Sequence, residues 1–495
     1  MDIEQEACEC PSPHSHLLGE DVTVKNSLLA SIALLSLGAS TTAVAAPPTP
    51  ASPAADRELA RSMFKELIEI NTNHDHGSTE AANAIARRLR GGGFADSDIT
   101  VIAPQAHPKS GNVVVRYRGA ARGTPVLFLG HLDVVDAKGE DWSVDPFKLT
   151  EQDGWFYGRG TIDMKDGDAA LVAALIRLRR EGFVPAHDVI AAFTADEEAG
   201  GDANGPAFLL KERRDLIDAG FVINLDGGGG VFKGGKRVMY EVGTSEKTYV
   251  TYTIETTSPG GHGSLPGADN AIYRLASGLG RLEAYKFPVM LTATTRASFK
   301  SHAALDPGPD SADMLAVAQA TPDLGAADRL SRNDYYNAQL RTTCVATLIS
   351  GGHAENALPQ RAKATIQCRM MPGDSAEQVQ TKLVAALNDT RITIKMDAPP
   401  IMSPESPLTP QVLSKVTAVV RAMWPGVPVV PGMATGFSDD RQTRNAGMPS
   451  YDASGIWTEM DENRAHGRDE RVGQQAFDES VEYTYRLVKA MGAAN

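Results

Sequence analysis

Residues 125–133 read Pro-Val-Leu-Phe-Leu-Gly-His-Leu-Asp. An unbroken apolar run that leads straight into His131 and Asp133 is typical of a strand buried on both faces of a parallel sheet. Two more apolar runs end the same way: residues 188–195 lead to Glu197 and Glu198, and residues 221–225 lead to Asp226. In open α/β sheets the ligand crevice lies outside the carboxyl ends of the strands, so we expect these polar side chains to meet there.

The pattern around these strands predicts two domains. From about residue 56, helical segments such as 57–69, 79–90 and 166–181 alternate with apolar strands, which favours a mostly parallel sheet. From residue 247 the order becomes β-α-β-β-α-β, the ferredoxin-like split unit, with a long segment at about 288–341 that shows no clear pattern. We therefore expect an α/β fold in which a ferredoxin-like domain, 247–397, is inserted into a discontinuous domain, 56–246 and 398–495.

Composition limits the partners of the chain. Its 495 residues carry a formal charge of −14, whereas nucleic-acid and anionic membrane surfaces require clustered Lys and Arg. We therefore expect no nucleic-acid partner.

The first 46 residues have the pattern of a leader. Lys25 precedes an apolar run at 28–37, and small residues follow at 43–45, which is the plan of a secretory signal peptide. The run is too short to span a bilayer, so we expect no stable membrane insertion after processing. We predict a signal peptide at about 24–45, a translation start near Val24, a linker at 47–55, and a secreted or periplasmic mature protein.

The predicted mature part contains two cysteines, Cys344 and Cys368, on neighbouring predicted strands. A cross-strand disulfide is conceivable in an oxidising compartment, but it requires close Cβ atoms. Two buried free thiols are the favoured interpretation.

The residue types at the strand ends are those of a metal centre. His131 and Asp133 are two apart, so on an extended backbone both face the same way. A ligating histidine usually donates its second ring N–H to a carboxylate, and Asp133 is well placed for that role. Glu197 and Glu198 are adjacent, so their side chains diverge and can do different work. Taken singly, each pattern also fits a surface pair or a solvated acidic turn.

Three motifs together resemble the M20 metallopeptidases, which include carboxypeptidases, dipeptidases, aminoacylases and desuccinylases with two co-catalytic zinc ions. The motifs are His-Leu-Asp-Val-Val at 131–135, Gly-Arg-Gly-Thr-Ile-Asp-Met-Lys-Asp-Gly at 158–167, and Ala-Asp-Glu-Glu-Ala-Gly-Gly at 195–201. Pro-Gly-Gly-His-Gly-Ser at 259–264 and Asn-Arg-Ala-His-Gly at 463–467 extend the similarity over nearly the whole mature chain.

The resemblance implies a role for each residue. It implies metal ligands at His131, Asp163, Glu198, Asp226 and His466, with Asp163 bridging two ions and a cis peptide bond after it. Glu197 would be the general base and Asp133 would orient His131. Met164 stands where family members often have a second acidic residue, which should not remove a ligand.

The resemblance also implies residues that contact the substrate. In the inserted domain, here a lid, His262 would reach the site of a neighbouring subunit in a homodimer, and Asn356 and Arg369 would hold a substrate carboxylate. Thr435 and Gly436 would lie in a substrate-contacting loop. Zinc is the expected metal, although cobalt and manganese suit the same ligands.

We therefore expect an exported zinc hydrolase of peptide or N-acyl amide bonds in small substrates with a free carboxylate. The enzymatic alternative is an aminopeptidase, in which Glu246 or Asp439 would anchor the free amine. A metal-bound protein without catalysis is a third, less favoured reading, because the ligand set and Glu197 are intact.

Overall fold

The computed structural model describes residues 49–494 except positions 51, 122, 306, 461 and 463. The predicted signal peptide at 24–45 lies outside these residues. The first helix, α1 (Ala54–Glu69), begins inside the segment predicted as a linker. Within the described part of the chain, no helix is both long and apolar enough to cross a membrane.

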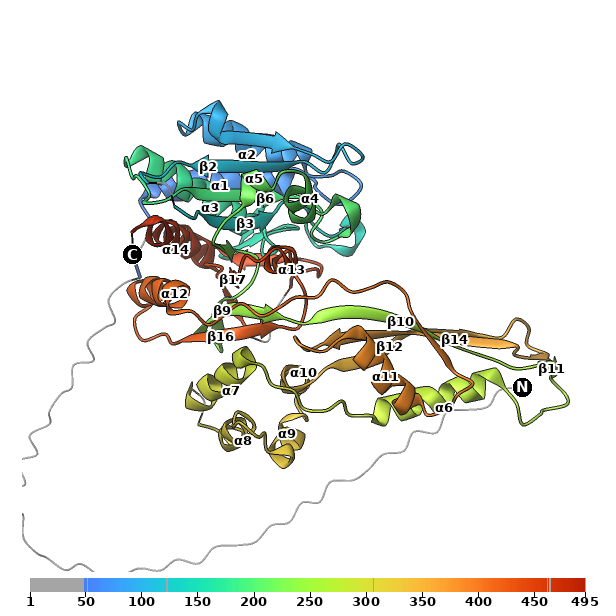
Figure 1. Cartoon of the computed structure of the whole chain (residues 1–495). Coiled ribbons are helices and arrows are strands. Elements are labelled where there is room, and N and C mark those ends of the chain that lie inside the picture. The colour runs from blue at the N-terminus through green and yellow to red at the C-terminus, as the bar shows by residue number, and fades with distance from the viewer. Residues whose placement is uncertain are drawn as a thin grey trace, which may run out of the picture. The chain divides into compact units, whose positions relative to one another are not determined.

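A ten-stranded sheet forms the centre of the larger body (Figure 1). Its order is β1 (Ile99–Ile102), β2 (Asn112–Tyr117), β6 (Val189–Thr194), β3 (Val126–His131), β7 (Phe221–Asn224), β17 (Ser450–Asp452), β9 (Lys236–Glu246), β8 (Gly229–Lys233) and β18 (Trp457–Glu459), with β16 (Val429–Ala434) paired to β9. The neighbouring strands β6, β3, β7 and β17 pair in parallel, as predicted. The pairs β1–β2, β2–β6 and β8–β9 are antiparallel.

Burial on both faces explains the unbroken apolar sequence of β3. Val126 and Phe128 belong to the core beneath α1, α2 (Thr79–Gly91), α3 (Lys165–Arg180) and α14 (Gln474–Gly492). Leu127 and Leu129 belong to the opposite core, together with residues of α4 (Gly205–Glu212) and α5 (Arg214–Ile217). Alternate side chains therefore enter different cores, and neither face tolerates polar residues before His131.

A second, antiparallel sheet has the order β12 (Thr343–Gly351), β14 (Arg361–Met370), β10 (Thr248–Thr257) and β15 (Thr393–Met396). Helices α6 (Ala271–Ala284) and α11 (Ala376–Leu387) supply side chains to its core. The chain order β10-α6-β12-β14-α11-β15 is the predicted ferredoxin-like unit. Only Lys247 separates β9 from β10, so one nearly continuous strand links the two sheets.

The segment at about 288–341, which the sequence pattern left open, is helical. It holds α7 (Ala293–Leu305), α8 (Ser311–Val317), α9 (Leu324–Leu330) and α10 (Asp334–Leu340). These helices bury their own small core, which includes Phe299, Met314 and Leu330. Gln339 donates to the backbone oxygen of Met433 at the end of β16, so the segment also packs against the central sheet.

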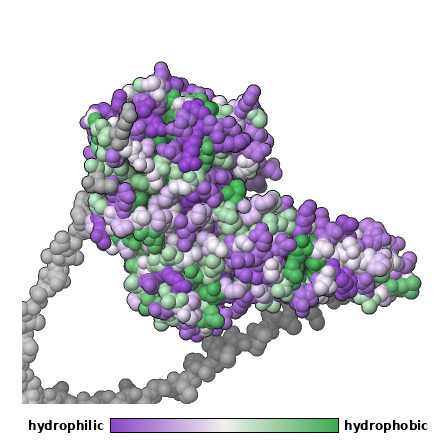
Figure 2. Space-filling view, in the orientation of Figure 1, coloured by the Kyte–Doolittle hydropathy of each residue, from purple (hydrophilic) through white to green (hydrophobic). Residues whose placement is uncertain are grey.

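The remaining elements are short. Helices α12 (Pro410–Met423) and α13 (Asp440–Asn445) flank β16, and β4 (Thr150–Gln152), β5 (Trp155–Tyr157) and β19 (Arg471–Gly473) form a three-stranded sheet. A two-stranded ribbon joins β11 (Gly261–His262) to β13 (Ala357–Leu358). The face of the molecule shown in Figure 2 is largely hydrophilic, and its apolar residues lie in separate patches.

The two cysteines form a disulfide between β12 and β14. The expectation of free thiols was therefore wrong. The strand register explains why the bridge forms. Cys344 lies directly opposite Cys368 in the antiparallel ladder, which brings the two Cβ atoms close enough for their sulfurs to be joined.

Candidate active site

Three neighbouring parallel strands deliver the first group of polar side chains to one edge of the central sheet. His131 is the last residue of β3, the Asp196–Glu198 segment follows β6, and Asp226 follows β7. Because β6, β3 and β7 are adjacent and parallel, their carboxyl ends meet, as the sequence predicted.

Two loops far apart in the sequence complete the cluster. Asp163 precedes α3, and His466 lies beyond β18. The Nε2 atom of His131 is 3.1 Å from Oδ1 of Asp163, and the Nε2 atom of His466 is 3.0 Å from Oδ2 of the same carboxylate. Asp163 thus lies between two histidines, and the peptide bond that follows it is cis, as predicted.

The five predicted ligands form two overlapping groups that could each hold a metal ion. One consists of His131, Asp163 and Asp226; the other consists of Asp163, Glu198 and His466. Within each group the donor atoms lie within 4.8 Å of one another. Imidazole nitrogens and carboxylate oxygens are the ligands of catalytic zinc sites, so the donor set fits two divalent cations that share Asp163.

The electrostatics of the cluster agree with a cationic occupant. Burial lowers the pKa of His131, but Asp226, Asp163 and Asp133 outweigh it and hold that pKa well above its usual value. Burial likewise opposes ionisation of Asp163, yet hydrogen bonds with both histidines bring its pKa below the usual range. The carboxylates here are thus arranged to stabilise positive charge.

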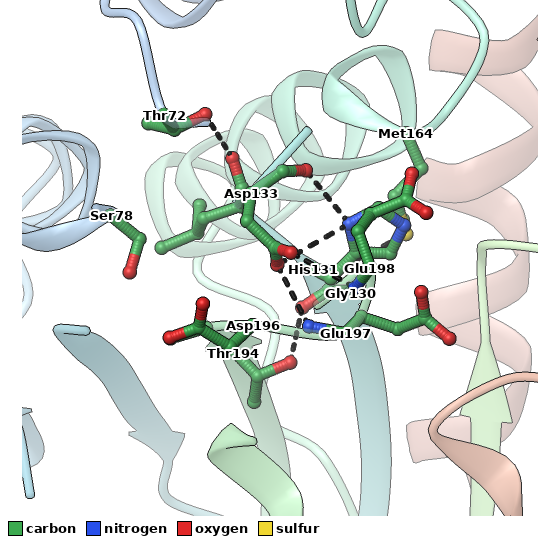
Figure 3. Close-up of polar contacts among 12 residues, drawn as sticks. Thr72, Ser78, Gly130, His131, Asp133, Met164, Thr194, Asp196, Glu197 and Glu198 are labelled. Carbon is green, nitrogen blue, oxygen red and sulfur yellow. Dashed lines mark hydrogen bonds and ion pairs between the residues drawn. The ribbon is translucent and has the colours of Figure 1, made fainter. Parts of the chain in front are cut away.

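Asp133 contacts more than His131 (Figure 3). Its carboxylate oxygens accept hydrogen bonds from the backbone amides of Glu197 and Glu198, each at 3.0 Å. Nδ1 of His131 lies 3.0 Å from the backbone oxygen of Asp133 but 3.7 Å from its carboxylate. Burial raises the pKa of Asp133 to about 6, against the effect of His131. Asp133 therefore positions the loop after β6 as well as the imidazole.

Glu197 is 6% exposed and makes no ion pair among the described residues, although one of its carboxylate oxygens lies within 4.8 Å of donor atoms of His131 and Glu198. Its Oε1 atom has no hydrogen-bond partner among the described residues. Burial, the largest effect, together with Asp439 and Asp226, raises its pKa well above the usual value, although His131 acts in the opposite direction. A buried carboxylate of raised proton affinity with a free oxygen is suited to proton transfer.

A cavity of about 640 Å³ adjoins the cluster and is lined by residues of both sheets. Glu198 lines it from the central sheet, and Arg369 of β14 lines it from the second sheet. The structure thus brings Arg369 next to the predicted metal ligands. Thr435 and Gly436 are exposed in the loop after β16, directly before Phe437, which also lines the cavity.

His262 and Asn356 lie elsewhere. The backbone amide of Gly263 donates to the backbone oxygen of Asn356, so the two predicted residues sit together at the β11–β13 ribbon. This ribbon follows the far end of β10, and ten strand residues span about 33 Å. Both side chains are exposed at the tip of the second sheet (Figure 1), away from the cluster of their own chain.

The two acids considered as amine anchors are already engaged. Oε1 of Glu246 accepts from Ser403 at 2.6 Å and its Oε2 accepts from Ser438 at 2.7 Å. Asp439 accepts from Asn204 at 2.6 Å and from Thr194 at 3.2 Å. Both carboxylates therefore already have hydrogen-bond partners within the protein.

Two sets of residues at the site were not predicted from the sequence. Glu470 accepts hydrogen bonds from Arg159 and from the backbone of Ile162, and so ties the loop of Asp163 to the loop of His466. Tyr249, Phe437 and Arg441 line the cavity. The only sequence feature that pointed to Glu470 was its position four residues after His466. The three cavity residues come together only when both sheets are folded, so no local pattern predicts them.

Comparison with known proteins agrees with this site. The model of Peptidase family M20/M25/M40 matches residues 127–490. N-fatty-acyl-amino acid synthase/hydrolase PM20D1 of Xenopus tropicalis is 28% identical over 376 residues, 74% of this chain and 72% of that protein. Probable carboxypeptidase S-like 2 of Dictyostelium discoideum is 29% identical over 374 residues, 74% of this chain and 71% of that protein.

Solved structures share the fold. The M20 family metallo-carboxypeptidase Sso-CP2 from Sulfolobus solfataricus aligns with a TM-score of 0.65 at 17% identity, covering 88% of this chain and 99% of that chain. The match to the family model spans both loops of the ligand cluster and the strands of the central sheet other than β1 and β2. The chain therefore belongs to peptidase family M20/M25/M40 and is a hydrolase of peptide or amide C–N bonds.

Proposed function

We propose that this chain hydrolyses the amide bond of N-acyl amino acids or short peptides that carry a free carboxylate, with two zinc ions as cofactors. The observation that carries the proposal is the position of Asp163 between His131 and His466, with the unpaired oxygen of Glu197 in the same cluster. The relatives PM20D1 and Sso-CP2 are by name an N-fatty-acyl-amino acid hydrolase and a carboxypeptidase, which supports this substrate class.

The ligand assignment follows from the two donor groups. His131 and Asp226 would hold one ion, Glu198 and His466 the other, and Asp163 both. Bound divalent ions supply Lewis acidity, which polarises a carbonyl and lowers the pKa of water. Zinc suits the nitrogen and oxygen ligands, and cobalt or manganese would suit them too.

Proton transfer is assigned to Glu197. Its free Oε1 would accept the proton of the attacking water and then deliver it to the nitrogen of the leaving amine. Such positioned acid–base catalysis contributes about 10²–10⁴-fold. Asp133 would keep Glu197 in place through its bond to the Glu197 amide, and its carbonyl would fix the tautomer of His131.

Arg369 would bind the substrate carboxylate. Its Nη1 is buried without a partner among the described residues, and it lines the same cavity as Glu198. A guanidinium fork pairs with a carboxylate through two parallel hydrogen bonds. A carboxylate anchor is preferred to an amine anchor because Arg369 has an unpaired nitrogen, whereas Glu246 and Asp439 already accept hydrogen bonds from Ser403 and Asn204.

We further propose a homodimer through the second sheet. Strand β12 is an edge strand, and its Val345, Leu348 and Ile349 are 59–68% exposed. An exposed apolar edge strand is suited to pairing with another chain. Such a dimer would let His262 and Asn356, which lie away from their own cluster, complete the partner's site, with His262 stabilising the oxyanion.

The chain is proposed to divide into a catalytic domain, 56–246 with 398–495, and a lid domain, 247–397. Export is proposed from the signal-peptide pattern at 24–45. The disulfide supports export independently, because such bonds persist mainly in oxidising compartments.

One hydrolysis panel tests the proposed activity. Zinc-loaded mature protein would be given N-blocked dipeptides, N-acyl amino acids and unblocked aminoacyl amides, with products identified by mass spectrometry. We expect release of the C-terminal amino acid from the blocked substrates and none with Glu197→Gln. Cleavage of the aminoacyl amides alone would make the enzyme an aminopeptidase and would refute the role given to Arg369.

A further inference from the structure

The cavity beside Glu198 contains two guanidinium groups with no hydrogen-bond or ion-pair partner in the described part of the chain. Arg369 lies on β14 of the lid, and Arg441 lies on α13 of the central body. Arg441 is only 9% exposed. The Nη1 atom of Arg369 and the Nε atom of Arg441 are both buried and unpaired.

Aromatic rings hold these groups without neutralising them. The guanidinium carbon of Arg441 lies 4.0 Å from the ring centre of Phe437, and that of Arg369 lies 5.7 Å from the same ring and 5.5 Å from the ring of Tyr249. A cation–π contact is attractive, but it satisfies none of the N–H donors. Arg441 is buried, and so is the Nη1 atom of Arg369; because a buried N–H donor without a partner is costly, the two arginines favour an anionic ligand in this cavity.

The carboxylates of the cavity do not supply the missing partners. Glu198 is paired with His466 at 2.8 Å, and Glu246 accepts from Ser438 at 2.7 Å. Asp397 accepts from Thr253 at 2.8 Å.

Asp439 lies two residues before Arg441 and attracts its positive charge without forming an ion pair with it among the described residues. The oxygens of Asp439 instead accept hydrogen bonds from Asn204 and Thr194. Two guanidinium groups of the cavity therefore keep N–H donors that no carboxylate of its lining accepts.

Two arginines offer more N–H donors than one carboxylate can accept through paired, parallel hydrogen bonds. Each guanidinium can form two parallel hydrogen bonds with one carboxylate, and the two arginines come from different domains of the proposed division. A ligand with two anionic groups would pair one group with each arginine, and so remove the cost of leaving either guanidinium group without a partner.

We propose that Arg441 is a specificity-determining residue that binds a second carboxylate, so that preferred substrates are dianions. This inference rests on the proposed function, in which Arg369 binds the first carboxylate. The second carboxylate would be either the side chain of an Asp or Glu on the amine half or the free end of a dicarboxylic acyl group.

The test measures binding in matched ligand pairs that differ by one charge. Zinc-loaded Glu197→Gln protein would be titrated calorimetrically with N-acetyl-L-glutamate against N-acetyl-L-glutamine, and with N-succinyl-L-methionine against N-succinamoyl-L-methionine. We expect the dianion to bind at least about 10-fold more tightly in one pair, since losing one partner of a buried charge pair costs that much or more. The pair that shows the preference identifies the half of the substrate that Arg441 contacts.

Adding Arg441→Gln should abolish the preference, while Arg441→Lys should retain part of it. Arg421→Gln, which removes an exposed arginine of α12, is the matched control and should leave the preference unchanged. Thermal unfolding of each variant would show that it is folded.

Equal binding within both pairs, or a preference that survives Arg441→Gln, would overturn the inference. Hydrolysis of the four amides by the unsubstituted enzyme separates the two proposals. Cleavage of all four at similar kcat/KM would refute the second anchor alone, whereas cleavage of none would refute the proposed function and leave the binding data to decide the role of Arg441.

Discussion

The carboxylate of Asp133 holds the backbone of Glu197: its Oδ1 accepts the Glu197 amide at 3.0 Å, although 64 residues separate them in sequence. The other oxygen, Oδ2, accepts the amide of Glu198 at the same distance. Both oxygens are therefore occupied in fixing the residues proposed as general base and metal ligand.

Substituting Asp133→Asn should misplace this loop. An asparagine has one acceptor oxygen, so its NH₂ group would face one of the two amides. We expect kcat/KM to fall about 10–100-fold, the usual cost of losing a partner that orients ligands. Asp202→Asn, at an exposed position of the same loop region, should leave kcat/KM unchanged. An Asp133→Asn enzyme with full activity would show that the two hydrogen bonds are not needed.

Glu197→Gln and Glu198→Gln should differ in metal content. Glu197→Gln should retain two metal ions per chain and lose at least about 100-fold in kcat, because only the proton acceptor is removed. Glu198→Gln should retain fewer ions, since it removes a ligand from the group with Asp163 and His466. Elemental analysis after dialysis, beside kinetics, tests both. The reverse pattern would mean that the two roles are exchanged.

The disulfide should stabilise the lid. Cys344 and Cys368 are 24 residues apart, and closing a loop of that size is worth about 3 kcal/mol in the chain-entropy model. Replacing both cysteines by serine should lower the free energy of unfolding by about that amount in urea denaturation. The doubly substituted protein should also lose any dependence of stability on reductant. Equal stability of the two proteins would contradict a bridge in the folded chain.

Lys247, which connects the two sheets, should make stability depend on pH. Burial, assisted by Arg369 and opposed by Asp374, lowers its pKa to about 7, whereas an unfolded lysine titrates near 10.4. Below about pH 7 both states are protonated and the folded chain bears the full cost of a buried charge. Between about pH 7 and pH 10 only the unfolded state binds this proton, so the contribution of Lys247 to the free energy of unfolding rises with pH.

The difference in unfolding free energy between the unsubstituted protein and Lys247→Met should therefore increase from pH 7 to pH 10. Lys363→Met, an exposed lysine of β14, should give a difference that is flat over this range. A flat difference for Lys247→Met as well would mean that its ammonium group keeps an ordinary pKa in the folded chain.

The sequence predicted those parts of the molecule that follow from local pattern. The apolar run of β3 implies burial on both faces, and the similar runs of β6 and β7 led to the expectation that His131 lies beside the ends of these strands, as it does. The order of the lid elements was readable because its strands alternate and its helices carry an apolar stripe. The cis peptide after Asp163 came from resemblance, not from pattern.

Other parts depend on contacts that no local pattern contains. Helices α8, α9 and α10 have seven residues each, too few to show a helical period, and they gain stability by packing on one another. The Cys344–Cys368 bridge depends on strand register, which the sequence left open. No local pattern distinguishes Arg441, because its lack of a partner is a property of the assembled cavity.

The separation of His262 from its own acidic cluster has a genetic consequence. If each site takes His262 from one copy and Glu197 from the other, a chain lacking His262 and a chain lacking Glu197 are defective in different halves of the same site. Each homodimer would be inactive, but a mixed dimer would contain one site in which both residues are intact. Two null alleles of such a gene would then complement each other, and co-expression of the two defective chains would restore activity that neither possesses alone.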